Sequence, residues 1–89
     1  MANYVIVRHS VRDFSEWRTG YDAHEPVRAA ARLTEKHVLQ DAADPNMVTL
    51  IFEAEDLKHA EEFSRSDDLR EVMQKVGVLG KPDMYFLKG

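Results

Sequence analysis

Two segments rich in apolar and β-branched residues constrain the fold more than any other feature of the sequence. Residues 3–11 read NYVIVRHSV and residues 47–54 read MVTLIFEA. Runs of this length and composition are typical of β-strands. They are the most apolar strands of the chain, so we expect them to lie in the centre of one sheet.

The segment after the first strand has the pattern of an interrupted helix. Asp13 and Glu16 have the spacing of a capping box, and an apolar stripe follows them at helical spacing. Pro26 removes a backbone hydrogen bond and clashes with the preceding turn, which predicts a kink or break within residues 22–26. A short helical piece is expected to resume at 27–33.

The second half of the sequence alternates turn signals with shorter regular segments. The Asp-Pro-Asn turn at 44–46 separates two strands, which indicates a β-hairpin. The apolar spacing of the helical region changes phase near Ser66, which predicts two short helices that meet at residues 64–67. The expected elements of this half are strands at 35–41 and 47–54, helices between Glu55 and Gly77, and a last strand at 83–88 after Gly80 and Pro82.

The order strand–helix–strand–strand–helix–strand defines the fold class. It is the split βαβ arrangement of an α+β, ferredoxin-like (βαββαβ) domain. Right-handed crossovers then place the first and third strands in the centre of a four-stranded antiparallel sheet, with the helices on one face. With 89 residues, the chain is expected to form one domain, 1–89.

The helices cover only one face of such a sheet, yet both faces of its strands are apolar. Val5 and Val7 alternate with Ile6 in the first strand, and Leu50 is followed by Ile51 in the third. An uncovered apolar patch usually marks an interface. We therefore expect a symmetric homodimer that packs sheet to sheet, and the alternative is a monomer with a slightly apolar sheet.

Composition excludes several function classes. The formal net charge of −4 argues against a nucleic acid or an anionic membrane as the main partner. The sequence has no cysteine, which excludes thiolate chemistry and disulfides. The longest apolar runs are far shorter than the roughly 18 residues of a membrane span, so a cytoplasmic protein is expected.

Several motifs together resemble a known group of proteins. They are DFSEW at 13–17, YDAHEPVR at 21–28, DPN at 44–46, FSRSDDLR at 63–70 and GVLGKP at 77–82. Their pattern resembles the dimeric α+β barrel superfamily and, more narrowly, short bacterial proteins labelled cyclase-like or antibiotic-biosynthesis-monooxygenase-like. The resemblance implies the fold and a homodimer. It does not assign a reaction, because the superfamily includes cofactor-free oxygenases, polyketide cyclases, haem enzymes and stress proteins.

Four residues are the catalytic candidates. His24 and Arg28 lie beside the proline break, four residues apart, and together they could bind a carboxylate or an enolate. His9 on the first strand and His37 on the second could act as a general base near neutral pH if either faces the interior. For each of the four, the alternative is a purely structural role.

Three aromatic residues are candidates for the substrate pocket: Trp17, Tyr21 and Tyr85. No metal site is predicted, because Arg28 stands where the HExxH zinc motif needs its second histidine. No cofactor is predicted either.

These observations favour a homodimer with a small apolar cavity between each sheet and its helices. The cavity is expected to hold a small aromatic or polyketide-like molecule, and base-assisted cyclisation or cofactor-free oxygenation is the expected class of any reaction. Two alternatives stay open: a non-enzymatic stress or structural dimer, and a haem-binding protein.

Overall fold

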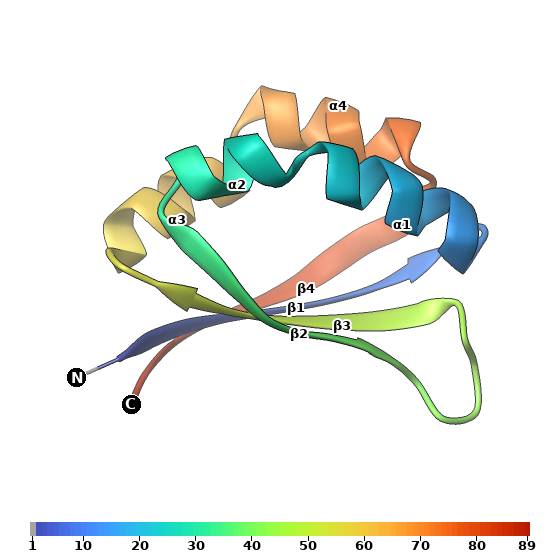
Figure 1. Cartoon of the computed structure of the whole chain (residues 1–89), viewed down its shortest axis with the longest axis horizontal. Helices are drawn as coiled ribbons and strands as arrows, with labels where there is room; N and C mark the ends of the chain where they lie inside the picture. Colours follow the sequence, from blue (N-terminus) through green and yellow to red (C-terminus); the bar gives the residue numbers. More distant parts are fainter. Residues whose placement is uncertain (1) are drawn as a thin grey trace.

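A computed structural model describes residues 2–89 and shows an antiparallel sheet with a layer of helices on one face (Figure 1). The strand order is β2-β3-β1-β4, so the two most apolar strands are central. The predicted α+β, ferredoxin-like fold is confirmed. The elements in chain order are β1 (Asn3–Val11), α1 (Phe14–Ala23), α2 (Glu25–Ala30), β2 (Leu33–Gln40), β3 (Met47–Ala54), α3 (Leu57–Ser64), α4 (Asp67–Lys75) and β4 (Val78–Lys88).

Two strands begin earlier than the sequence pattern indicates. β2 begins at Leu33 instead of residue 35, and β4 begins at Val78 instead of residue 83. Gly80, with a φ of +68°, and Pro82 therefore lie inside β4. Both are tolerated because β4 is an edge strand, and its register against β1 shifts along this segment.

The helical region after β1 is broken where the proline predicts it. Asp13 caps α1, since its side chain accepts hydrogen bonds from the backbone N–H groups of Ser15 and Glu16. α1 ends at Ala23 and α2 begins at Glu25, with Pro26 in the first turn of α2, where its missing N–H is not needed. The second piece is shorter than the predicted 27–33, because Arg32 adopts a φ of +62° and turns the chain into β2.

The other helical region also consists of two helices, as predicted. α3 ends at Ser64, and Ser66 caps α4 by accepting a hydrogen bond from the N–H of Leu69 at 3.2 Å. α4 contributes only partly buried residues to the layer. No helix among residues 2–89 is both long and apolar enough to span a membrane.

The two faces of the sheet have different environments. The inner face packs against the helices, and its buried residues are Val5, Val7, His9, Val11, Val48, Leu50, Phe52 and Ala54. The outer face has no helix over it in this chain (Figure 1) and carries the exposed apolar side chains Leu39, Leu79, Tyr85 and Leu87.

Candidate functional site

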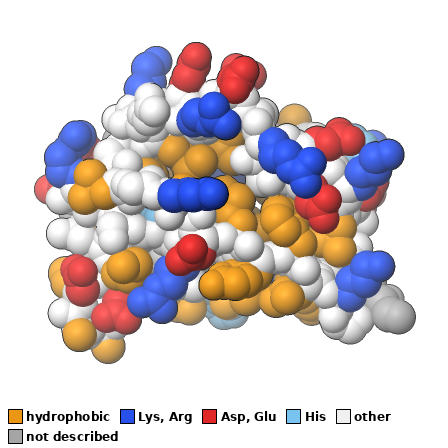
Figure 2. All heavy atoms as spheres, turned by 180° about the vertical axis from the view of Figure 1, so that it is seen from behind, with side chains coloured by type: hydrophobic (Ala, Val, Ile, Leu, Met, Phe, Trp, Pro, Cys, Tyr) orange, Lys and Arg blue, Asp and Glu red, His pale blue; other side chains and the backbone are white. Residues whose placement is uncertain are grey.

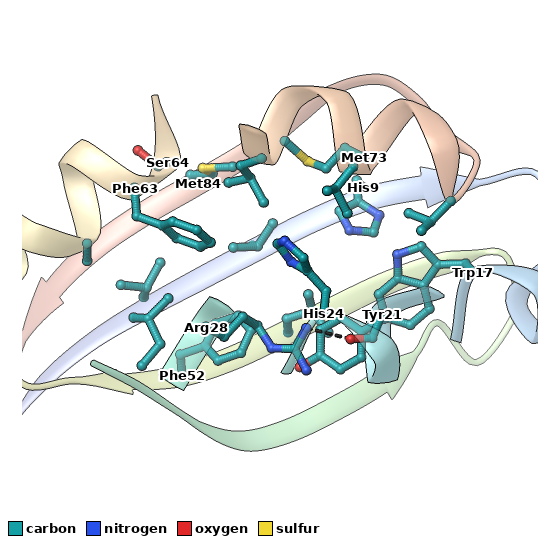
Figure 3. Close-up of a pocket in the computed structure, with 18 residues that line it drawn as sticks. His9, Trp17, Tyr21, His24, Arg28, Phe52, Phe63, Ser64, Met73 and Met84 are labelled. Atoms are coloured by element: carbon teal, nitrogen blue, oxygen red, sulfur yellow. Dashed lines mark hydrogen bonds between the residues drawn. The ribbon is translucent and has the colours of Figure 1, made fainter. Parts of the chain in front are cut away.

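A small cavity lies between the inner face of the sheet and the helix layer. It has a volume of about 80 Å³ and is partly open to solvent. Seen from behind, apolar side chains gather along the middle of the molecule, between the helices above and the sheet below (Figure 2). The lining is apolar apart from a few polar groups, among them His9, His24 and Arg28 (Figure 3).

Four side chains form a continuous row along one wall of this cavity. His9 meets Trp17 edge to face at 5.6 Å between ring centroids, and Trp17 stacks on Tyr21 at 4.8 Å. The guanidinium carbon of Arg28 lies 3.6 Å from the centroid of the Tyr21 ring, a cation–π contact. The aromatic pair therefore has an imidazole at one end and a guanidinium at the other.

His9 is buried without a hydrogen-bond partner on Nδ1. Its side chain points from β1 into the space under the helices, and only 5% of the residue is exposed. Burial lowers the pKa of His9 below its ordinary value, so the ring is neutral near pH 7. The neutral imidazole thus keeps one buried nitrogen without a partner, and the residue as a whole lines the cavity.

Arg28 is buried because the break between α1 and α2 turns it back toward α1. Its Nη1 donates a hydrogen bond of 2.6 Å to the carbonyl oxygen of Tyr21. That carbonyl belongs to the last turn of α1 and also accepts a hydrogen bond of 3.1 Å from the backbone N–H of His24. The ion pairs found among residues 2–89 do not include Arg28, although the residue is only 8% exposed.

His24 lies at the junction of α1 and α2 and points into the cavity (Figure 3). The centroid of its ring lies 6.5 Å from the ring centroid of Phe63, which belongs to α3 on the other side of the cavity. Partial burial and the positive charge of Arg28 lower the pKa of His24, and the charge of Asp68 opposes this effect. His24 is therefore a second imidazole that is neutral near pH 7.

Tyr21 is held in its protonated form. Its hydroxyl donates a hydrogen bond of 2.7 Å to Oε1 of Glu35. Burial and this hydrogen bond raise the pKa of Tyr21, which removes it as a base at neutral pH. The sequence pattern gives no indication of Glu35, because a carboxylate on an edge strand is usually solvated.

The structure brings together five of the seven predicted site residues and places the other two elsewhere. His9, Trp17, Tyr21, His24 and Arg28 all line the cavity. His37 pairs with Ile51 across the strands and is exposed on the outer face, because a register shift in β2 after Glu35 turns its side chain outward. Tyr85 pairs with Ile6 and is 53% exposed on the same outer face. The predicted positions of His37 and Tyr85 are thus corrected.

Sequence reasoning missed part of the apolar lining. Met73 of α4 and Met84 of β4 both face the cavity. The apolar stripe of α4 was a signal for Met73, but the meeting of the two side chains depends on the tertiary fold. Among residues 2–89, no group of three or more His, Asp or Glu side chains is arranged to hold a metal ion.

Comparisons with known proteins identify the fold and go no further. No family model matches the sequence, and no curated protein is significantly similar to it. A candidate antibiotic biosynthesis monooxygenase from Bordetella bronchiseptica superposes with a TM-score of 0.77 at 18% identity, over 99% of this chain and 96% of its own. A variant of SnoaB, a cofactor-independent oxygenase from Streptomyces nogalater, gives 0.74 at 9% identity, over 99% and 92% of the two chains.

A third solved structure agrees with these two. A candidate antibiotic biosynthesis monooxygenase from Nitrosomonas europaea superposes with a TM-score of 0.70 at 17% identity, over 98% of this chain and 97% of its own. The chain therefore has the ferredoxin-like fold of antibiotic biosynthesis monooxygenase-like proteins, as its motifs led us to expect. At these identities the likeness concerns the fold alone.

Proposed function

We propose that this protein is a homodimer that binds a small aromatic or polyketide-like molecule in the cavity between its sheet and its helices. The observation that carries the proposal is the presence of His9, His24 and Arg28 in a pocket whose lining is mostly apolar. Binding sites for small molecules typically combine an apolar lining with a few convergent polar groups. The likeness in fold to SnoaB, a cofactor-independent oxygenase, supports chemistry without a cofactor at this site.

The size of the cavity limits what enters it. Its volume is about 80 Å³. A cavity of about 150 Å³ in another protein holds benzene. A single ring therefore enters only with a small outward displacement of the lining, and a polyketide-like molecule must extend through the opening. α4 is the element expected to yield, because it contributes no fully buried residue.

The polar groups support base-assisted chemistry without a cofactor. A neutral His9 or His24 accepts a proton from an acidic C–H or hydroxyl group of the ligand. The guanidinium of Arg28 stabilises the resulting enolate or phenolate by a charge-assisted hydrogen bond. In a cyclisation, the enolate carbon then attacks a carbonyl carbon of the same molecule, and the proton returns from the imidazole to the alkoxide that forms. In an oxygenation, molecular oxygen is the second substrate: the carbanion carbon bonds to it, the imidazolium returns its proton to the peroxide anion, and the hydroperoxide loses water to leave a new carbonyl group.

The homodimer is proposed from the outer face of the sheet. Tyr85 and Leu87 of β4 are 53% and 43% exposed, and Leu39 of β2 is 45% exposed. Apolar burial stabilises by roughly 25 cal/mol per Å². Burial of several hundred Å² per chain on dimerisation therefore outweighs the exposed ion pairs of this face. Sedimentation velocity at micromolar concentration is expected to give a species of twice the 10.2 kDa chain mass. A Leu87→Lys variant should shift it to monomer, and a wild-type monomer would overturn this part of the proposal.

A non-enzymatic dimer is the second candidate, and the small volume of the cavity favours it. In that case the outer face holds two copies together and the cavity binds nothing. The haem alternative is not supported, because a macrocycle would have to separate the whole helix layer from the sheet to enter a space of about 80 Å³.

A ligand screen separates these candidates. Thermal shift measurements with aromatic acids, phenols and ring ketones are expected to reveal stabilisation by some of them, and His24→Ala should abolish it. His59→Ala, a change of the same kind on the exposed surface of α3, should leave it unaltered. If no compound stabilises the wild-type protein, the binding proposal fails and the structural candidate is favoured.

A further inference from the structure

Within residues 2–89 the guanidinium of Arg28 makes no ion pair, and the nearby carboxylate of Glu35 is bonded to the Tyr21 hydroxyl instead. Arg28 is only 8% exposed, and its one side-chain hydrogen bond goes to the neutral carbonyl oxygen of Tyr21. The stacking of its charge on the Tyr21 ring offsets part of the lost hydration. A buried charge is costly unless it is paired, so this position is favourable for an anion that enters the cavity.

The imidazole of His9 lacks a hydrogen-bond partner on one of its nitrogens. Its Nδ1 is buried and has no partner, whereas buried polar side-chain atoms in proteins are nearly always hydrogen-bonded. The tautomer decides whether Nδ1 donates or accepts. A hydroxyl group does both, so a ligand hydroxyl that reaches the imidazole can bond to it in either tautomer; reaching the buried Nδ1 requires the lining to move.

Aromatic surface lies between these two polar groups. The row runs from His9 to Trp17, then to Tyr21, and ends at Arg28, with neighbouring separations of 5.6, 4.8 and 3.6 Å. Figure 3 shows His9 next to Trp17 and Arg28 next to Tyr21, with the ring of His24 in the space between them. A flat ring that packs along this wall meets a hydrogen-bonding nitrogen at one end and a positive charge at the other.

We propose that the ligand is a hydroxyaryl carboxylic acid with a single ring, which binds as its anion with the carboxylate at Arg28 and the hydroxyl at His9. This inference rests on the proposed function, because it names the ligand class of the same cavity. The planar fork of an arginine matches a carboxylate, so the pairing is geometrically specific. The volume of about 80 Å³ favours one ring over several.

The test uses ligands that differ by one group. Isothermal titration of the wild-type protein compares the three hydroxybenzoate isomers with benzoate, and the best isomer with its amide. Hydrogen bonds to charged groups contribute about 1.5–3 kcal/mol, which corresponds to roughly tenfold to hundredfold in affinity. We expect the amide to bind at least about tenfold more weakly than the acid, and benzoate to bind more weakly than the best hydroxy isomer by a smaller factor.

Variants assign each effect to a residue. Arg28→Gln should remove the preference for acid over amide, while Arg65→Gln, a matched change at an exposed arginine of the α3–α4 junction, should preserve it. His9→Leu should remove the preference for the hydroxy acid over benzoate, while His59→Leu, at an exposed histidine of α3, should preserve it. The acid and amide series on the wild-type protein does not depend on the variants, so a misfolded Arg28→Gln leaves the test intact.

The outcomes are distinct. If the amide and the acid bind equally well, the inference is wrong, although the proposed binding function stands. If only rings without a hydroxyl bind, the role of His9 is wrong. If no aromatic compound binds at all, the inference and the proposed function fail together.

Discussion

Replacing His9 with leucine is expected to stabilise the protein while it weakens ligand binding. Leucine fills a similar volume but carries no polar atom, so the substitution removes the buried, unpartnered Nδ1. An unsatisfied buried polar group costs about 1–3 kcal/mol. The edge-to-face contact with Trp17 is lost, and contacts of this kind contribute about 0.5–1.5 kcal/mol.

The balance is a gain of about 1 kcal/mol in the free energy of unfolding, which raises the Tm of a domain of this size by about 4–8 °C. Differential scanning calorimetry and urea unfolding measure it. The control is His59→Leu on the exposed surface of α3, which should change the free energy of unfolding by less than about 0.5 kcal/mol. A His9→Leu variant less stable than wild type would refute the reasoning, because it would mean that Nδ1 has a partner, such as a bound water.

The pH dependence of the same variant has a defined sign. Burial lowers the pKa of His9 in the folded state below the ordinary value of 6.5, so the unfolded chain binds a proton that the folded chain does not. Proton uptake by His9 in the unfolded chain therefore lowers the free energy of unfolding as pH falls through 6.5 toward the folded pKa. His24, whose pKa is also lowered, acts in the same direction. The Tm difference between His9→Leu and wild type should thus grow as the pH is lowered from about 7.5 to about 5.5. A difference that stays constant over this range would contradict the lowered pKa of His9.

Three further substitutions test the fold that positions the site. Gly20→Ala places a Cβ against Cγ1 of Val76, too close for the two atoms to pack. Overpacking of this kind costs about 1–3 kcal/mol. Urea unfolding should show this loss of stability, and the double variant Gly20→Ala/Val76→Ala should recover part of it. Asp13→Ala removes the cap of α1 and should cost about 1 kcal/mol in the same assay, and an unchanged midpoint would mean that the cap contributes nothing. Tyr21→Phe removes the hydrogen bond to Glu35 and should cost about 0.5–1.5 kcal/mol, less if water replaces the hydroxyl.

The fold was predictable because its signals are local. The apolar strands at 3–11 and 47–54, the break at Pro26 and the cap at Ser66 each act through neighbouring residues, and their order leaves only one common topology. The start of β4 was not predictable in the same way. Gly80 and Pro82 are typical of a turn, and they remain in a strand only because that strand lies at the edge of the sheet.

The site was predictable in part for a related reason. His24 and Arg28 follow from the helix break, and Trp17 and Tyr21 follow from the apolar stripe of α1. The sequence left open whether His37 faces the interior, because the register shift within β2 that turns its side chain outward has no sequence signal here.

The contacts that give the site its chemistry are tertiary. The guanidinium of Arg28 reaches the carbonyl oxygen of Tyr21 because the chain turns back at residue 24. The absence of a partner for His9 Nδ1 depends on the packing of the helix layer over β1. Neither property is encoded in a short motif, so only the three-dimensional structure reveals them.

The central claim is that a ligand binds between the sheet and the helices, and the methionines of the chain test it directly. Met73 and Met84 line the cavity, whereas Met47 lies on the outer face beside Ser10. In the protein labelled with ¹³C at its methionine methyl groups, titration with a hydroxybenzoate should shift the Met73 and Met84 signals by the ring current and leave Met47 in place. Shifts confined to Met47, or none at a saturating concentration, would contradict the account.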